Sequence, residues 1–208
     1  MKPISEADLI INPDGSIYHL NLLPEDIADT VITVGDPDRV AEVSRYFDRI
    51  EVRKGKREFI TNTGYLGSKR ITVISTGIGT DNIDIVMNEL DALVNIDFKT
   101  RLPNKSLKSL SIIRIGTSGA IQEDLPMGTI LVSEFGLGLD ALMHYYLHEI
   151  SGDEHTILDA IKSHLHHLKG ISPYLTAADS VLLEKIGKDL PRGITVTAPG
   201  FYAPQGRE

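Results

Sequence analysis

The sequence predicts an α/β layered fold, because short runs rich in β-branched residues alternate along the chain with helical stretches. Its length of 208 residues suits one α/β domain with a core of useful size. Neither an internal repeat nor an interdomain linker interrupts the alternation. We therefore expect residues 1–208 to form a single domain.

The first half of the chain predicts two strand–helix units separated by a hairpin. A buried strand over residues 30–34 ends at a Gly-Asp-Pro turn, and a helix begins near Asp38. A hairpin over residues 59–75 turns at Gly67, and a second helix follows Gly79. Both helices are placed by apolar residues spaced for one face, namely Val40, Val43, Tyr46 and Phe47 in the first and Ile83, Val86, Met87, Leu90 and Leu93 in the second.

The second half begins with a polar, partly basic stretch over residues 95–109, which favours a solvated connection over an anion-binding loop. The elements expected after it are strands at 111–115 and 129–133, a helix at 153–168, and strands at 171–177 and 193–198. Residues 199–208 are dense in glycine and proline and resemble a loop. Because such a terminal segment normally frays, we expect the native chain to continue beyond it.

Composition excludes several classes of function. The net charge of −8 disfavours nucleic acid, whose binding depends on Lys and Arg at the phosphates. The absence of cysteine excludes disulfides, thiol catalysis and cysteine-based metal sites. No apolar run is long enough to span a bilayer and the first residues lack a signal peptide, so a cytoplasmic location without membrane contact is expected.

Two predicted strands end in turns that combine glycine with arginine. In the first turn, VGDPDR, Gly35 lets a ligand oxygen approach the backbone N–H, and Arg39 follows early in the helix. In the second, RIGTSGA, Arg114 lies on the strand, several glycines can expose N–H donors and Thr117 adds a hydroxyl. Free N–H groups and guanidinium groups are the components of phosphate sites. Strand ends of an open sheet can share one crevice.

Each turn also has a simpler interpretation. A Gly-Asp-Pro sequence is more often only a turn, and an arginine on a strand is more often a surface ion-pair partner. The glycine-rich run STGIGT at residues 75–80 matches neither a dinucleotide fingerprint nor a P-loop, and a tight strand-to-helix turn explains it. Two histidine pairs have metal-ligand spacing but no recognisable partners, so solvated helix faces are favoured; they are His144 with His148 and His164 with His167.

The motifs VGDPDRV, KREF, STGIG, RIGTSGAI and FYAPQGR occur in this order between residues 34 and 207. With them the chain resembles the uridine phosphorylase branch of the nucleoside phosphorylase family over about residues 19–207. The resemblance implies a three-layer α/β/α fold with a mixed central sheet, lacking the family's C-terminal strand and helix. It also implies phosphorolysis of uridine or a related pyrimidine nucleoside to the free base and ribose 1-phosphate. Inorganic phosphate is then a co-substrate, and no cofactor or metal is expected.

The resemblance also implies roles for individual residues. Gly35, Arg39, Arg114 and Thr117 would bind phosphate, and Arg57 would reach the phosphate of a neighbouring subunit. His19 would approach the ribose 5′-hydroxyl across a dimer interface, in a homodimer or homohexamer. Gln205 and Arg207 would read the uracil edge, with Phe201 packed on the base. Arg114, Gln205 and Arg207 would carry catalysis, because the departing uracil gains negative charge.

Three departures from the family pattern are present. Pro199-Gly200 replaces polar residues before the Phe-Tyr pair, and Thr80-Asp81-Asn82 replaces a small Gly-Pro-Ser-like run. The Glu-Met-Glu motif that holds the ribose hydroxyls would lie beyond residue 208. Two alternatives therefore remain: a purine phosphorylase or nucleosidase of the same fold, and a non-catalytic protein that binds nucleosides or anions.

Overall fold

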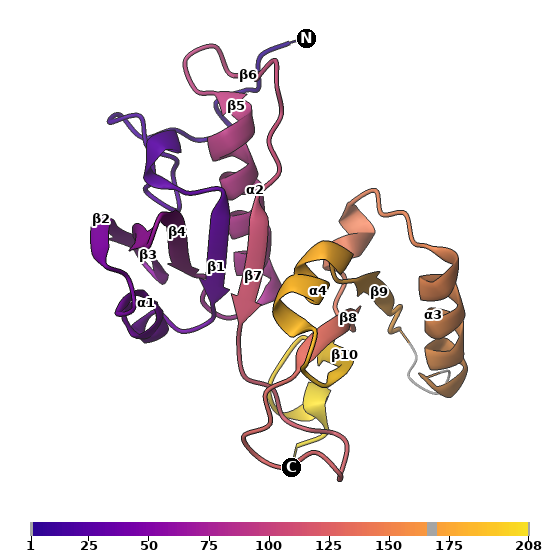
Figure 1. Ribbon diagram of the computed structural model, residues 1–208. Coiled ribbons are helices and arrows are strands. Elements are labelled where there is room, and N and C mark those ends of the chain that lie inside the picture. The colour runs from indigo at the N-terminus through magenta and orange to yellow at the C-terminus, as the bar shows by residue number, and fades with distance from the viewer. Residues whose placement is uncertain (1, 166–169, 208) are drawn as a thin grey trace. The chain divides into compact units, whose positions relative to one another are not determined.

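The computed structural model describes residues 2–165 and 170–207. They form two compact units (Figure 1), the first ending at Gly116 and the second beginning at Thr117. The single domain expected from the sequence stays a prediction. Among the described residues, none of the helices combines the length and the apolar character that a membrane span requires.

The first unit is built on a five-stranded mixed sheet in the order β2-β3-β4-β1-β7. The strands are β1 (Thr30–Val34), β2 (Arg49–Lys56), β3 (Phe59–Leu66), β4 (Lys69–Ser75) and β7 (Ser111–Ile115). Strand β1 is parallel to β4 and β7, whereas β2, β3 and β4 form an antiparallel meander. The predicted mixed sheet and the hairpin of residues 59–75 are confirmed.

Successive side chains of a strand point to opposite faces, so apolar residues lie on both faces of this sheet. Helices cover both faces. Val31 and Ile74 face a core cluster shared with helix α2 (Thr80–Asn95). Val34 and Val73 face a second cluster with helix α1 (Asp38–Ser44). The first unit is therefore a three-layer α/β/α arrangement, with α1 on one face and α2 on the other.

The two helices differ in how well apolar spacing predicted them. In α2 the expected residues Val86, Leu90 and Leu93 are buried. Helix α1 ends at Ser44, however, so the expected place of Tyr46 on its apolar face is wrong, and this side chain is 63% exposed. Phe47 still packs against the α1 cluster from the segment that follows.

The stretch over residues 95–109 is more ordered than a solvated connection. It contains two short paired strands, β5 (Ile96–Asp97) and β6 (Leu102–Pro103). Between them, Arg101 donates hydrogen bonds to the backbone oxygens of Ile4, Ser5 and Leu9. The prediction is wrong for this arginine, because it fastens the N-terminal segment to the unit.

The second unit contains a three-stranded mixed sheet in the order β10-β8-β9. Its strands are β8 (Val132–Gly138), β9 (Tyr174–Ala177) and β10 (Arg192–Thr197), and its helices are α3 (Gly152–Leu165) and α4 (Ser180–Gly187). Strand β8 begins three residues later than predicted, and residues 166–168 of the expected α3 lie outside the described residues. The described residues also form three short 3₁₀ helices, at Pro24–Asp26, Leu142–Tyr145 and Ala203–Gln205.

The core of the second unit is small, and buried polar contacts reinforce it. Leu137, Leu158 and Leu175 form its buried apolar cluster. Glu154 on α3 accepts backbone hydrogen bonds from Ser151 at 2.6 Å and from Ala177 on β9 at 2.7 Å. These hydrogen bonds lower the pKa of the Glu154 carboxyl and connect α3 to the sheet.

Candidate functional site

The carboxyl ends of β1 and β7 lie side by side, because these parallel strands pair as Thr33 with Arg114 and Val34 with Ile115. The Arg114 guanidinium lies beside Gly35: a Cβ added at Gly35 would be 3.6 Å from its Nη2. A Cβ at Gly116 would be 3.7 Å from the Nε of the same arginine. The two glycines leave room around the guanidinium at the edge where a sheet of this kind receives ligands.

A second arginine accompanies Arg114. The pKa of the Arg114 guanidinium is lowered from its ordinary value, first by burial among protein atoms and then by the positive charge of Arg39. Although much of its surface is exposed, the group is thus partly desolvated and faces a like charge. Within the described part of the chain, neither arginine forms an ion pair. Two close cations without a carboxylate favour binding of an anion.

The glycine-rich turn after β4 adjoins the Gly35 turn. The Thr76 N–H donates to the Val34 oxygen at 2.8 Å, and a Cβ at Gly35 would lie 3.9 Å from the Gly77 oxygen. Gly77 has φ +69°, and a side chain there would collide with Asn82 and Glu58. The expected tight strand-to-helix turn is present, and it packs directly against the turn that carries Gly35.

Arg57 lies in the two-residue loop of the β2–β3 hairpin, between the paired residues Lys56 and Phe59. Its φ of +56° is a left-handed conformation that non-glycine residues seldom adopt. The side chain is exposed and has no partner within the described residues. A two-residue hairpin loop requires a positive φ at its first residue, so the turn itself accounts for this conformation.

His19 lies in the N-terminal segment, where Glu89 of α2 holds it. The Glu89 carboxylate accepts the His19 backbone N–H at 3.1 Å and the Leu20 backbone N–H at 2.9 Å. It also lies 2.6 Å from Nδ1 of the imidazole. The sequence interpretation missed Glu89. The available signal was an acidic residue on the apolar face of a predicted helix, where charged side chains need a partner.

In the second unit, the base-reading residues expected from the sequence contact one another. The Arg207 guanidinium lies 4.2 Å from the centre of the Phe201 ring, and its Nε donates to Gln205 Oε1 at 3.3 Å. A Cβ at Gly119 would lie 3.8 Å from Nη2 of Arg207. All of these side chains are exposed, as is Thr117 at the start of the unit. Arg207 therefore lies beside Gly119, in the segment that follows Thr117.

The described residues thus bring together two sets of the predicted side chains. Gly35, Arg39 and Arg114 form one set, and Phe201, Gln205 and Arg207 form the other. Within the first unit, neither Arg57 nor His19 is hydrogen-bonded or ion-paired to a member of the first set.

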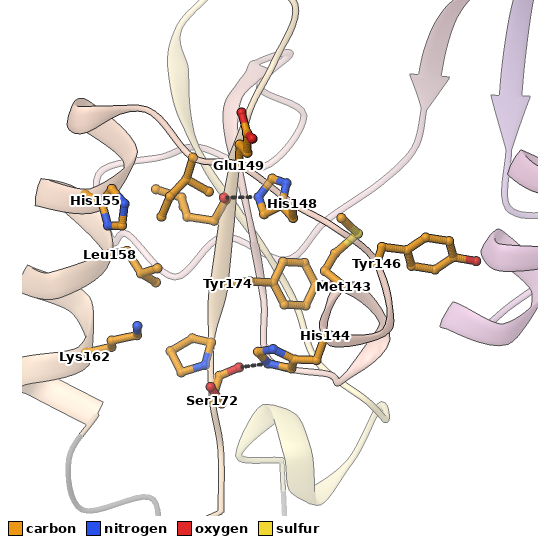
Figure 2. Close-up of a pocket in the computed structure, with 13 residues that line it drawn as sticks. Met143, His144, Tyr146, His148, Glu149, His155, Leu158, Lys162, Ser172 and Tyr174 are labelled. Carbon is orange, nitrogen blue, oxygen red and sulfur yellow. Dashed lines mark hydrogen bonds between the residues drawn. The ribbon is translucent and has the colours of Figure 1, made fainter.

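A pocket of about 640 Å³ in the second unit lies between α3, β9 and residues 143–150 (Figure 2). The Nε2–H of His144 donates to the Ser172 oxygen at 2.8 Å, and that of His148 to the Leu175 oxygen at 3.2 Å. The two imidazoles are therefore directed at backbone rather than at a shared metal. No metal-binding group of three or more suitable side chains occurs in residues 2–165 or 170–207. Of the other pair, His167 lies outside the described residues.

Comparison with known proteins places these features in a family. The model of the phosphorylase superfamily matches residues 29–208. The uridine phosphorylase of Haemophilus influenzae is 29% identical over 92% of this chain and 65% of its own length. That of Escherichia coli is 33% identical over 62% of this chain and 47% of its own length.

A solved structure gives the same result. The chain superimposes with a TM-score of 0.86 on a Trypanosoma brucei nucleoside phosphorylase that shows uridine phosphorylase activity. That protein is 32% identical, and the alignment covers 96% of this chain and 72% of the other. Of the two bacterial relatives, the chain spans about two thirds of the length or less.

Proposed function

The chain belongs to the phosphorylase superfamily, and we propose that it cleaves uridine or a related pyrimidine nucleoside with phosphate, giving the free base and ribose 1-phosphate. The observation that carries the proposal is the Arg114 guanidinium beside Gly35. It has no ion-pair partner among the described residues, and the nearby positive charge of Arg39 lowers its pKa. A hydrolase needs water at the anomeric carbon, whereas two unpaired guanidinium groups suit a phosphate nucleophile. The Haemophilus influenzae relative is a uridine phosphorylase, and the Trypanosoma brucei protein shows uridine phosphorylase activity, which supports the same reaction.

In this reaction a phosphate oxygen forms a bond to the anomeric carbon while the bond to the base nitrogen breaks. Arg39, Arg114, the Gly35 N–H and the Thr117 hydroxyl hold the phosphate, so that a two-body encounter becomes a reaction within the site. The electrons of the broken bond move to the uracil ring. Donors on Arg207 and Gln205 bind that developing charge more strongly than they bind the ground state.

We further propose that the site is completed by a second copy of the chain in a homodimer or homohexamer. Arg57 supports this proposal, because its side chain is exposed in a hairpin loop and lacks a partner among the described residues. Its guanidinium would contact the phosphate of the neighbouring subunit, and His19 the ribose 5′-hydroxyl. The reaction requires phosphate as co-substrate and no cofactor, and a cytoplasmic location stays a prediction.

Base choice is tested by replacing the amide that is assigned to the uracil edge. Gln205→Leu leaves the polar atoms of uracil without their partners, which we expect to cost about 1–3 kcal/mol in kcat/KM for uridine. Uracil release is followed by absorbance. Gln122→Leu is the matched control, since Gln122 is also an exposed glutamine of the second unit, and it should retain full activity. The parent should cleave inosine poorly. Comparable kcat/KM values for inosine and uridine would overturn the pyrimidine assignment.

A further inference from the structure

Glu89 is the polar anchor of His19 and of the backbone that follows it. Its side chain is only 11% exposed, and His19's side chain is 28% exposed. Both carboxylate oxygens are used: Oε1 lies 2.6 Å from His19 Nδ1, and Oε2 accepts the Leu20 N–H at 2.9 Å. Each oxygen is also 3.1 Å from the His19 backbone nitrogen. Helix α2 thereby fixes both the backbone and the imidazole of His19.

This arrangement determines which imidazole nitrogen carries the proton. An ionised carboxylate has no hydrogen to donate, so the short contact requires a hydrogen on Nδ1. In the neutral imidazole, Nε2 is then unprotonated and is a hydrogen-bond acceptor. Nε2 has no partner in the described part of the chain. The side chain is therefore prepared to accept a hydrogen bond from a hydroxyl group of a ligand.

We propose that Glu89 is a positioning residue that holds His19 as the acceptor for the 5′-hydroxyl of the nucleoside. This inference rests on the proposed function, in which His19 meets that hydroxyl in the neighbouring subunit. Glu89 does not touch the substrate. It acts by fixing the orientation and the protonated nitrogen of the residue that does, as the partners of metal-bound histidines do.

The kinetic test compares uridine with 5′-deoxyuridine, which lacks only the hydroxyl in question. The enzyme variants are His19→Ala, Glu89→Gln and the double variant, with Asp91→Asn as the control. Asp91 is an exposed acid on the same helix whose Oδ1 accepts a hydrogen bond from Asn95. Asparagine at this position removes the charge and keeps an acceptor.

In Glu89→Gln the amide NH₂ must face either a backbone N–H or Nδ1, so the arrangement of His19 is lost. We expect both single variants to lower kcat/KM for uridine about tenfold and to change it for 5′-deoxyuridine less than twofold. The double variant should be no worse than His19→Ala. Asp91→Asn should match the parent on both substrates.

Equal losses on the two substrates in Glu89→Gln, or full activity, would overturn the positioning role, because a purely structural defect does not depend on the 5′-hydroxyl. If Glu89→Gln fails to fold, ¹⁵N NMR of the parent decides. A neutral His19 with hydrogen on Nδ1 supports the proposal, and hydrogen on Nε2 contradicts it. Absence of phosphate-dependent uridine cleavage in the parent would instead reject the proposed function, while the NMR result still reports on Glu89 and His19.

Discussion

Arg114→Ala is expected to lower phosphate-dependent release of uracil from uridine by ~10²-fold or more, the usual cost of removing one pre-aimed donor. The guanidinium lies between Gly35 and Gly116 and is already partly desolvated. The two glycines leave this guanidinium accessible to phosphate. The alanine variant leaves Arg39 as the remaining cation of the pair.

The measurement is kcat/KM for uridine as a function of phosphate concentration. Arg53→Ala is the control, because Arg53 is an exposed strand arginine of the same sheet that lies on β2, away from the β1 and β7 strand ends. It should behave as the parent does. A loss of less than fivefold in Arg114→Ala, with an unchanged dependence on phosphate, would mean that Arg114 is not a phosphate ligand.

Phe59→Ala is expected to lower the free energy of unfolding by about 3–5 kcal/mol, which is typical of a large aromatic side chain removed from a core. Phe59 is 1% exposed and packs in the cluster that joins the sheet to α2. It also closes the hairpin loop of Arg57, since it pairs with Lys56. The cavity would therefore weaken both the core and the support of that loop.

Urea unfolding followed by circular dichroism measures this effect. Tyr202→Ala is the control for loss of an aromatic ring, because Tyr202 is 70% exposed, and its effect should stay within about 0.5 kcal/mol. A loss below about 1 kcal/mol in Phe59→Ala would show that the cluster around α2 is not the principal core of the first unit.

The α/β class and α2 were predictable because their apolar periodicity is strong, whereas the mixed sheet followed from the resemblance to the nucleoside phosphorylase family. Strand β2 was not recognised, since its alternation is carried by Arg, Glu and Lys side chains at the edge of the sheet. Helix α4 was also missed, because eight residues give a weak periodic signal. Tyr46 was expected on the apolar face of α1 because it has helical spacing from Val43, but the helix ends at Ser44.

The sequence likewise identified some residues of the candidate site and not others. Short motifs identified Gly35, Arg39 and Arg114, because the residues that form each turn are close together in the sequence. Glu89 was not identified, since its partner His19 lies 70 residues away in the chain. Spacing along the sequence cannot reveal a hydrogen bond of this kind. The structure is needed to show which acid is buried against which histidine.

The most direct test of the proposed reaction is to incubate the protein with uridine at a series of phosphate concentrations and follow both products. Uracil is measured by absorbance and ribose 1-phosphate by ³¹P NMR. We expect uracil release to require phosphate and the two products to form in equal amounts. Release of uracil at a similar rate without phosphate, with free ribose as the second product, would contradict the proposed reaction.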